Sequence, residues 1–183
     1  MEQMEIRKAK EEDLPGIMEI YGRARSFMAE NGNRSQWGDT YPPRELVRQD
    51  IEQGRCYVCE SENGVEGVFY FSIGEDPTYL LIEEGEWKNE EPYGAIHRVA
   101  SMGRIKGVAT RCIQWCQKQC PNLRIDTHED NKVMQRVLEK NGFCRCGKIY
   151  AEDGTPRIAY QKICAQPVTD GKGCESSVRN FSL

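Results

Sequence analysis

Residues 103–112, "GRIKGVATRC", join a strand-like run to a helix-like run. The chain alternates in polarity over residues 93–100, and residues 107–120 then follow with helical spacing. Glycine lets the main chain approach a ligand, the helix start presents free N–H groups, and Arg104 and Lys106 favour an anion. The turn predicts an α/β fold with a phosphate site, although an ordinary solvated turn explains these ten residues alone equally well.

Strand and helix patterns continue along the rest of the chain. Strand patterns cover residues 4–9, 55–61, 65–73, 93–100, 123–127, 143–150 and 157–163, and helix patterns cover residues 14–24, 44–53, 107–120 and 131–141. This order predicts one α/β domain over residues 1–164, with a mixed sheet and helices on its faces. Residues 165–183 lack periodicity, and we expect them to form a flexible tail.

Composition and charge exclude several classes of protein. The net charge of −4 gives no general attraction for nucleic acid. The charged first residues do not resemble a signal peptide, and no apolar run is long enough for a membrane span, so we expect a cytoplasmic protein. Nine cysteines without an export signal indicate reduced thiols. Cys112, Cys116 and Cys120 share one helical stripe, which favours core packing over a metal site, and we expect no bound metal.

Two motifs within residues 97–143 resemble the GCN5-related N-acetyltransferases (GNAT). After the strand that ends at Val99, "RIKGVA" places Arg104, Gly107 and Ala109 at the spacing of the family signature Gln/Arg-x-x-Gly-x-Gly/Ala. Downstream, "NKVMQRVLEKNGF" is similar to the second family motif, a helix that starts with Asn and closes in Gly-Phe. The resemblance implies a GNAT-like, mostly antiparallel mixed sheet flanked by helices, with splayed central strands that hold acyl-CoA.

The resemblance also implies how acetyl-CoA binds as co-substrate. Main-chain N–H groups of residues 105–109 would hold the pyrophosphate, with added charge from Arg104 and Lys106. The strand segment 97–99 and Asn131 would contact the pantetheine arm. The expected cofactor-binding residues are His97, Arg98, Val99, Arg104, Ile105, Lys106, Gly107, Val108, Ala109 and Asn131.

The implied reaction is direct attack of a primary amine on the thioester, which needs a base for the amine and is helped by an acid for the thiolate. We expect His97 to be the base, on one strand face with Val99, and His128 is the alternative. The position where many family members place a tyrosine acid is Leu138, which cannot donate a proton. Either the thiolate leaves without an acid, or another group protonates it, for which Tyr150 is the candidate. Direct transfer needs no cysteine nucleophile.

The acceptor is expected to contact the loop "QWGDTYP", through Trp37, Asp39 and Tyr41. An indole, a phenol and a carboxylate suit an apolar cation, and a small-molecule amine is the first expectation. A protein N-terminus or lysine is a second, and a non-catalytic acyl-CoA-binding module of the same fold is a third. We expect no nucleic-acid or membrane partner, and a homodimer is left open.

Overall fold

A computed structural model describes residues 3–164, so the predicted tail at 165–183 lies outside the described residues. Seven strands occur in this part of the chain: β1 (Glu5–Lys8), β2 (Cys56–Ser61), β3 (Gly64–Ile73), β4 (Gly94–Ser101), β5 (Asn122–Thr127), β6 (Cys144–Tyr150) and β7 (Pro156–Ile163). The helices are α1 (Leu14–Glu30), α2 (Arg44–Glu52), α3 (Val108–Gln119) and α4 (Lys132–Lys140), with 3-10 turns η1 (Glu11–Asp13) and η2 (Pro77–Tyr79). Each predicted strand and helix is found, with ends that differ by a few residues; the first helix runs further than its pattern.

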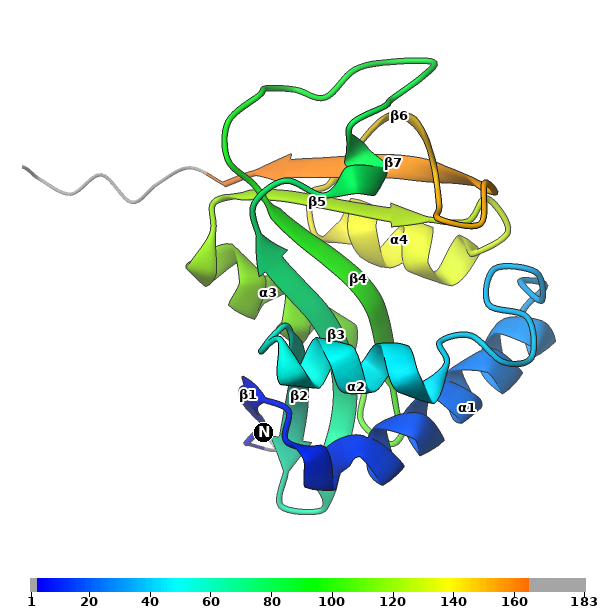
Figure 1. Ribbon diagram of the computed structural model, residues 1–183, viewed down its shortest axis with the longest axis vertical. Coiled ribbons are helices and arrows are strands. Elements are labelled where there is room, and N and C mark those ends of the chain that lie inside the picture. The colour runs from blue at the N-terminus through cyan, green and yellow to red at the C-terminus, as the bar shows by residue number, and fades with distance from the viewer. Residues whose placement is uncertain (1–2, 165–183) are drawn as a thin grey trace, which may run out of the picture.

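The strands form one sheet in the order β1-β2-β3-β4-β5-β7-β6 (Figure 1). All neighbouring pairs are antiparallel except β4 and β5, which run parallel at the centre. The mixed, mostly antiparallel sheet of the prediction is therefore confirmed.

Helices cover both faces of this sheet. Successive side chains of a strand point to opposite sides, so the apolar side chains of the strands need a core on each face. On β3, Val68 packs in a core with residues of α1 and α2, whereas Phe69 packs in a core with residues of α3 and α4. A third core, which includes Tyr79 and Tyr93, lies between the segment of residues 74–93 and strands β4, β6 and β7. Figure 1 shows this segment arching over the half of the sheet that α1 and α2 leave uncovered.

A bulge in β4 changes which side its residues face. His97 pairs with Tyr70 and Ala100 pairs with Val68, so two residues of β4 oppose one residue of β3, and Arg98 has φ 51°. Val99 consequently packs against the core of α3 and α4. The prediction that His97 and Val99 share a face is wrong, because the bulge interrupts the simple alternation of side chains.

Candidate active site

The central strands separate where the bulge begins. β4 and β5 pair only through residues 94–96 and 123–125, although both strands continue. Main-chain groups of residues 97–101 that face β5 therefore have no strand partner. Of these residues, the Arg98 carbonyl oxygen accepts a hydrogen bond from the Tyr21 hydroxyl at 3.0 Å. The split leaves polar main chain without a strand partner at the centre of the sheet, as an extended ligand would require.

Beyond the split, the start of α3 presents free main-chain donors. Gly107 has φ 80° and precedes the helix. Arg111 N–H donates to the Gly107 carbonyl oxygen at 3.0 Å, so the N–H groups of residues 108–110 come before this bond and lack a carbonyl partner within the helix. A Cβ at Gly107 would have no protein atom within 4 Å. The predicted phosphate loop thus has open space in front of a helix start.

The two cations of this loop have different surroundings. Arg104 donates to Glu66 at 2.8 Å and 3.2 Å, and Glu66 is 1% exposed and also accepts from the Ser61 hydroxyl. The Met102 N–H donates to the Glu66 carbonyl oxygen at 2.8 Å. The charge of Arg104, whose side chain is half exposed, is therefore paired with a buried carboxylate, contrary to the expectation that it adds free charge for the phosphates. Lys106 is exposed and has no hydrogen-bond or ion-pair partner within residues 3–164.

His97 lies between two carboxylates on the face of β4 turned away from α3. Its Nε2 is 2.7 Å from Asp76 Oδ2, and its Nδ1 is 3.8 Å from Asp126 Oδ2. Thr78 N–H and hydroxyl both donate to the other Asp76 oxygen, and the Tyr79 hydroxyl donates to Asp126 at 3.3 Å. The side chains of His97, Asp76 and Asp126 are 13–18% exposed. Residues from β4, β5 and the segment of residues 74–93 therefore meet at the split.

The pKa values of the two carboxylates are shifted in opposite directions. Burial opposes ionisation of Asp76, but hydrogen bonds from His97 and Thr78 outweigh it and lower its pKa to about 2. Burial raises the pKa of Asp126 above its ordinary value, although His97 and Arg157 act in the opposite direction. Asp76 is thus a fixed anion, and the charge of Asp126 depends more on what binds beside it.

Arg98 extends from the bulge toward α2 and the loop after α1. It donates to Asp50 at 2.6 Å and to the Tyr41 hydroxyl at 3.3 Å, and its guanidinium lies over the Tyr70 ring. Its Nε is buried without a hydrogen-bond partner among the described residues. The Arg98 side chain is thus bound on the same side as Tyr70 and Tyr41, and only its main chain is left for the predicted acyl-CoA contact.

The predicted acceptor residues divide into two groups. Trp37 packs edge-to-face on Tyr21 at 5.6 Å and lies 6.2 Å from the Tyr41 ring. Tyr21 and Tyr41 both contact Arg98, so these aromatic rings border the bulge. Asp39 is exposed and has no partner within residues 3–164. The structure thus brings Trp37 and Tyr41 to the site and shows no contact that draws Asp39 into it.

Asn131 caps α4 and ties the loop after α1 to it. Its side-chain oxygen accepts from Met134 N–H, and its Nδ2 donates to Gln36 at 3.0 Å. Gln36 also accepts from Asn33 and, through its carbonyl oxygen, from Arg157 of β7. This loop therefore bridges the two halves of the sheet, and Asn131 has a structural partner for both of its polar groups.

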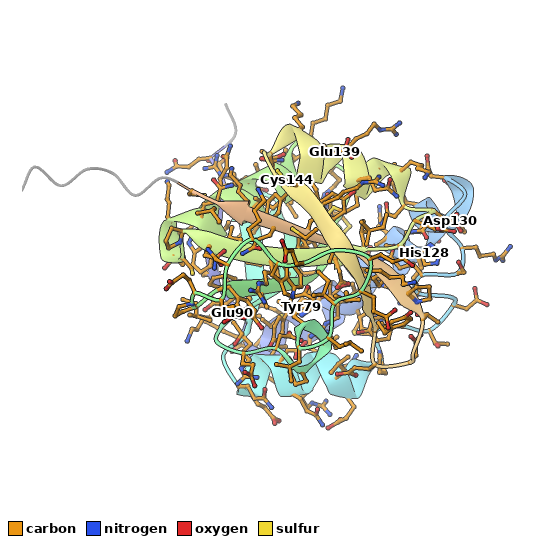
Figure 2. All side chains as sticks on the ribbon, turned by 90° about the horizontal axis from the view of Figure 1, so that it is seen from above. Tyr79, Glu90, His128, Asp130, Glu139 and Cys144 are labelled. Carbon is orange, nitrogen blue, oxygen red and sulfur yellow. The ribbon has the colours of Figure 1, made fainter. Side chains whose placement is uncertain are left out.

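The structure does not bring Tyr150 to His97. Tyr150 lies on β6, at the sheet edge beyond β5 and β7, and its hydroxyl donates to Glu83 at 2.8 Å. Leu138 is fully buried in the core. His128 follows β5, and its Nδ1 accepts from Asp130 N–H at 3.0 Å. Figure 2 shows His128 and Asp130 at one side of the molecule, away from Tyr79 near its centre. We therefore carry neither Tyr150 nor His128 forward as an acid or a base.

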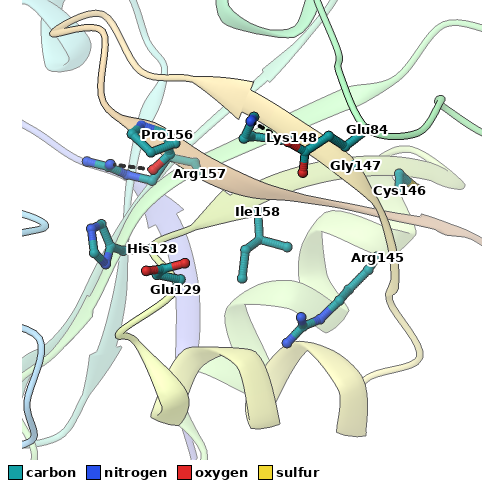
Figure 3. Close-up of a pocket in the computed structure, with 10 residues that line it drawn as sticks. All are labelled: Glu84, His128, Glu129, Arg145, Cys146, Gly147, Lys148, Pro156, Arg157 and Ile158. Carbon is teal, nitrogen blue, oxygen red and sulfur yellow. Dashed lines mark hydrogen bonds and ion pairs between the residues drawn. The ribbon is translucent and has the colours of Figure 1, made fainter.

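A separate cavity of about 450 Å³ lies beside β6 and β7 (Figure 3). Two of its charged side chains, Lys148 and Glu84, form an ion pair of 2.6 Å. It is lined by Glu84, His128, Glu129, Arg145, Cys146, Gly147, Lys148, Pro156, Arg157 and Ile158. None of these residues belongs to the β4 bulge or the α3 loop, so this cavity is not the predicted acyl-CoA site.

Sequence reasoning missed Asp76, Asp126 and Glu66. Asp76 lies in the acidic segment of residues 74–87, for which the sequence allows two interpretations, attraction of an amine or a solvated loop. Asp126 lies near the end of the strand pattern at residues 123–127. The alternation of β5 could have placed Asp126 opposite the core face, because Leu123 and Ile125 pack in the core of α3 and α4. No local pattern indicates that Glu66 would meet Arg104.

Similarity to solved structures agrees with this geometry. An acetyltransferase of the GNAT family from Streptococcus agalactiae is 32% identical, covers 91% of this chain and 99% of its own, and superposes with a TM-score of 0.81. GNAT acetyltransferases from Listeria monocytogenes and Bacillus cereus are 20% and 21% identical. They cover 87% and 90% of this chain and 94% and 99% of their own, with TM-scores of 0.65 and 0.59. A scan against protein-family models and a search of curated proteins each give no match.

Residues 3–164 were also compared with the requirements of a membrane span and of a metal site. None of their helices combines the length and apolarity that crossing a bilayer would demand. No three His, Cys, Asp or Glu side chains of this part are placed to hold a metal ion together. The order of the strands, the central split and the 32% identity over nearly the whole length of a family member lead to one conclusion: the chain belongs to the GCN5-related N-acetyltransferase family, whose solved members listed above are acetyltransferases.

Proposed function

We propose that this protein transfers the acetyl group of acetyl-CoA to a primary amine by direct attack. The observation that carries the proposal is the split between β4 and β5, which has unpaired main chain on β4 and the free N–H groups of α3 beyond it. His97 and two carboxylates lie at the same split, on the opposite face of β4 from α3.

Acetyl-CoA fits the α3 side of the split. The N–H groups of residues 108–110 and the exposed ammonium of Lys106 suit a pyrophosphate, and Gly107 leaves the approach open. Unpaired main chain of residues 97–101 suits the amide-bearing pantetheine arm as a partial strand partner. A main-chain N–H in this segment would also stabilise the oxyanion that forms on the attacked carbonyl.

The acceptor amine would approach from the other face. There His97 is the base that we propose, and Trp37 and Tyr41 offer aromatic surface for the body of the amine. The loop that carries both rings is tied to α4 and β7 by Gln36, so it bounds the acceptor side with a fixed wall. A bounded site favours a small amine over a protein segment.

The first test is a comparison of ligands by thermal unfolding. Acetyl-CoA should raise the melting temperature with increasing concentration, because it binds the native state, whereas ATP and NAD should do so much less. Equal shifts for the three would refute the acyl-CoA assignment. Release of free CoA with a panel of small amines, amino acids and a lysine peptide then identifies the acceptor class. Binding without turnover on every amine would support a non-catalytic acyl-CoA-binding module.

A further inference from the structure

The two ring nitrogens of His97 face different carboxylates, Asp76 beside Nε2 and Asp126 beside Nδ1. We propose that Asp76 fixes the imidazole with its proton on Nε2, and that the ammonium group of the acceptor binds between His97 Nδ1 and Asp126. The proposal rests on the proposed function and adds to it a positioning residue, an ammonium-binding residue and the atom that takes the proton.

The tautomer follows from the surroundings of Asp76. One of its oxygens accepts from Thr78 N–H at 3.0 Å and from the Thr78 hydroxyl at 2.6 Å, and the other faces His97 Nε2 at 2.7 Å. Asp76 N–H donates to the Tyr93 hydroxyl, which holds the segment in place. An ionised carboxylate can only accept hydrogen bonds, so Nε2 must carry a proton, and in the neutral ring Nδ1 then has the free lone pair.

The other side of the ring has two acceptors without a shared proton. His97 Nδ1 and Asp126 Oδ2 are 3.8 Å apart, beyond hydrogen-bond distance. A lone pair facing a carboxylate oxygen is unfavourable unless a donor joins them. A primary ammonium supplies two N–H bonds and a positive charge, so it can donate to both atoms at once. The aromatic rings of Tyr70 and Tyr79 flank the imidazole, each with its centre 5.4 Å away, and would restrict water beside the ammonium.

These groups account for each proton that moves in the reaction. The ammonium gives one proton to His97 Nδ1, and the resulting imidazolium is held between Asp76 and Asp126. The free amine forms the C–N bond with the acetyl carbon, and the C–S bond breaks toward sulfur. A second amine proton leaves the tetrahedral adduct for the departing thiolate, which gives the neutral amide and the CoA thiol. His97 then releases its proton to solvent. No tyrosine acid is needed, which fits Leu138 at that position.

The tautomer can be tested in the free protein, so this test does not depend on enzymatic activity. Nitrogen-15 spectra of the two histidine rings at about pH 9, where ordinary histidines are neutral, should show His97 protonated on Nε2. The variant His128→Gln removes one of the two rings and so assigns the remaining signals to His97. In Asp76→Asn the oxygen stays on Thr78, so the amide NH₂ donates to Nε2 and the proton moves to Nδ1. Asp130→Asn is the matched control, since Asp130 lies 3.7 Å from the other histidine. A His97 protonated on Nδ1 in the unmodified protein would overturn the assignment.

The ammonium site is tested by adding propylammonium and following the nitrogen-15 signals of the His97 ring. Tetramethylammonium, which has the charge but no N–H, is the comparison ion. Propylammonium should give a saturable shift that is about tenfold or more weaker in Asp126→Asn and unchanged in Asp130→Asn. No saturable shift, or equal affinity in Asp126→Asn, would overturn the site. With an amine that turns over, Asp126→Asn should raise KM and Asp76→Asn should lower kcat. If no amine turns over while the spectra behave as expected, the proposed function fails and the tautomer assignment stands.

Discussion

Replacing Gly107 with glutamine should separate acetyl-CoA binding from folding. Gly107 has φ 80° and ψ 12°, and a Cβ there would have no protein atom within 4 Å. The change therefore costs the left-handed backbone penalty, about 1–2 kcal/mol, and adds no clash. For a chain of this size, that loss lowers the melting temperature by about 2–8 °C.

The effect on binding should be larger than the effect on stability. The glutamine side chain would project from the turn at which we propose that the phosphates approach the N–H groups of residues 108–110. Losing one or two charge-assisted hydrogen bonds, at about 1.5–3 kcal/mol each, weakens binding by about tenfold to about 10⁴-fold. Gly107→Ala, with a shorter side chain, should cost the same stability and less affinity.

Gly154 provides a matched control in the turn between β6 and β7. Its φ is 79°, and a Cβ there also meets no protein atom within 4 Å. Gly154→Gln should therefore lose a similar amount of stability and bind acetyl-CoA normally, as measured by calorimetry with thermal unfolding alongside. Equal affinities for folded Gly107→Gln and Gly154→Gln would refute the placement of the phosphates at this turn.

Two further predictions concern buried ionisable groups. The pKa of Asp76 is lowered to about 2, so Asp76 stabilises the fold above its ordinary pKa near 4, and this contribution is lost as the pH falls toward 2. The contribution is about 2 kcal/mol. Chemical unfolding at about pH 7 and at about pH 2.5, where most of this contribution is already lost, should show a smaller pH-dependent loss of stability in Asp76→Asn than in the unmodified protein. An equal loss would contradict the Asp76–His97 contact. Burial raises the pKa of Cys116, and contact with Cys59 and burial raise that of Cys112, so neither thiol is ionised at pH 7. Cys116→Ala should keep its turnover per folded molecule, and complete loss in a folded variant would point to a covalent intermediate instead of direct transfer.

Much of the fold and the conformation of the turn before α3 could be predicted from the sequence, because local signals define them. Alternating and helical periodicity located each strand and helix, and glycines with a helix start marked the turn at residues 103–107. The family motifs lie in the same segment. Such features depend on main-chain conformation over a few residues, which the residue types themselves determine.

Only the tertiary structure decided the surroundings of His97, because its contacts join residues far apart in the chain. Asp76 and Asp126 reach His97 from another loop and another strand. The bulge at Arg98 reverses the expected face of Val99, and it depends on how β3 pairs with β4 and on the Tyr21 hydroxyl. Local periodicity cannot report such a register shift, since one extra residue exchanges the two faces of a strand. For the same reason, the order of the strands alone showed that Tyr150 lies at the sheet edge, away from His97.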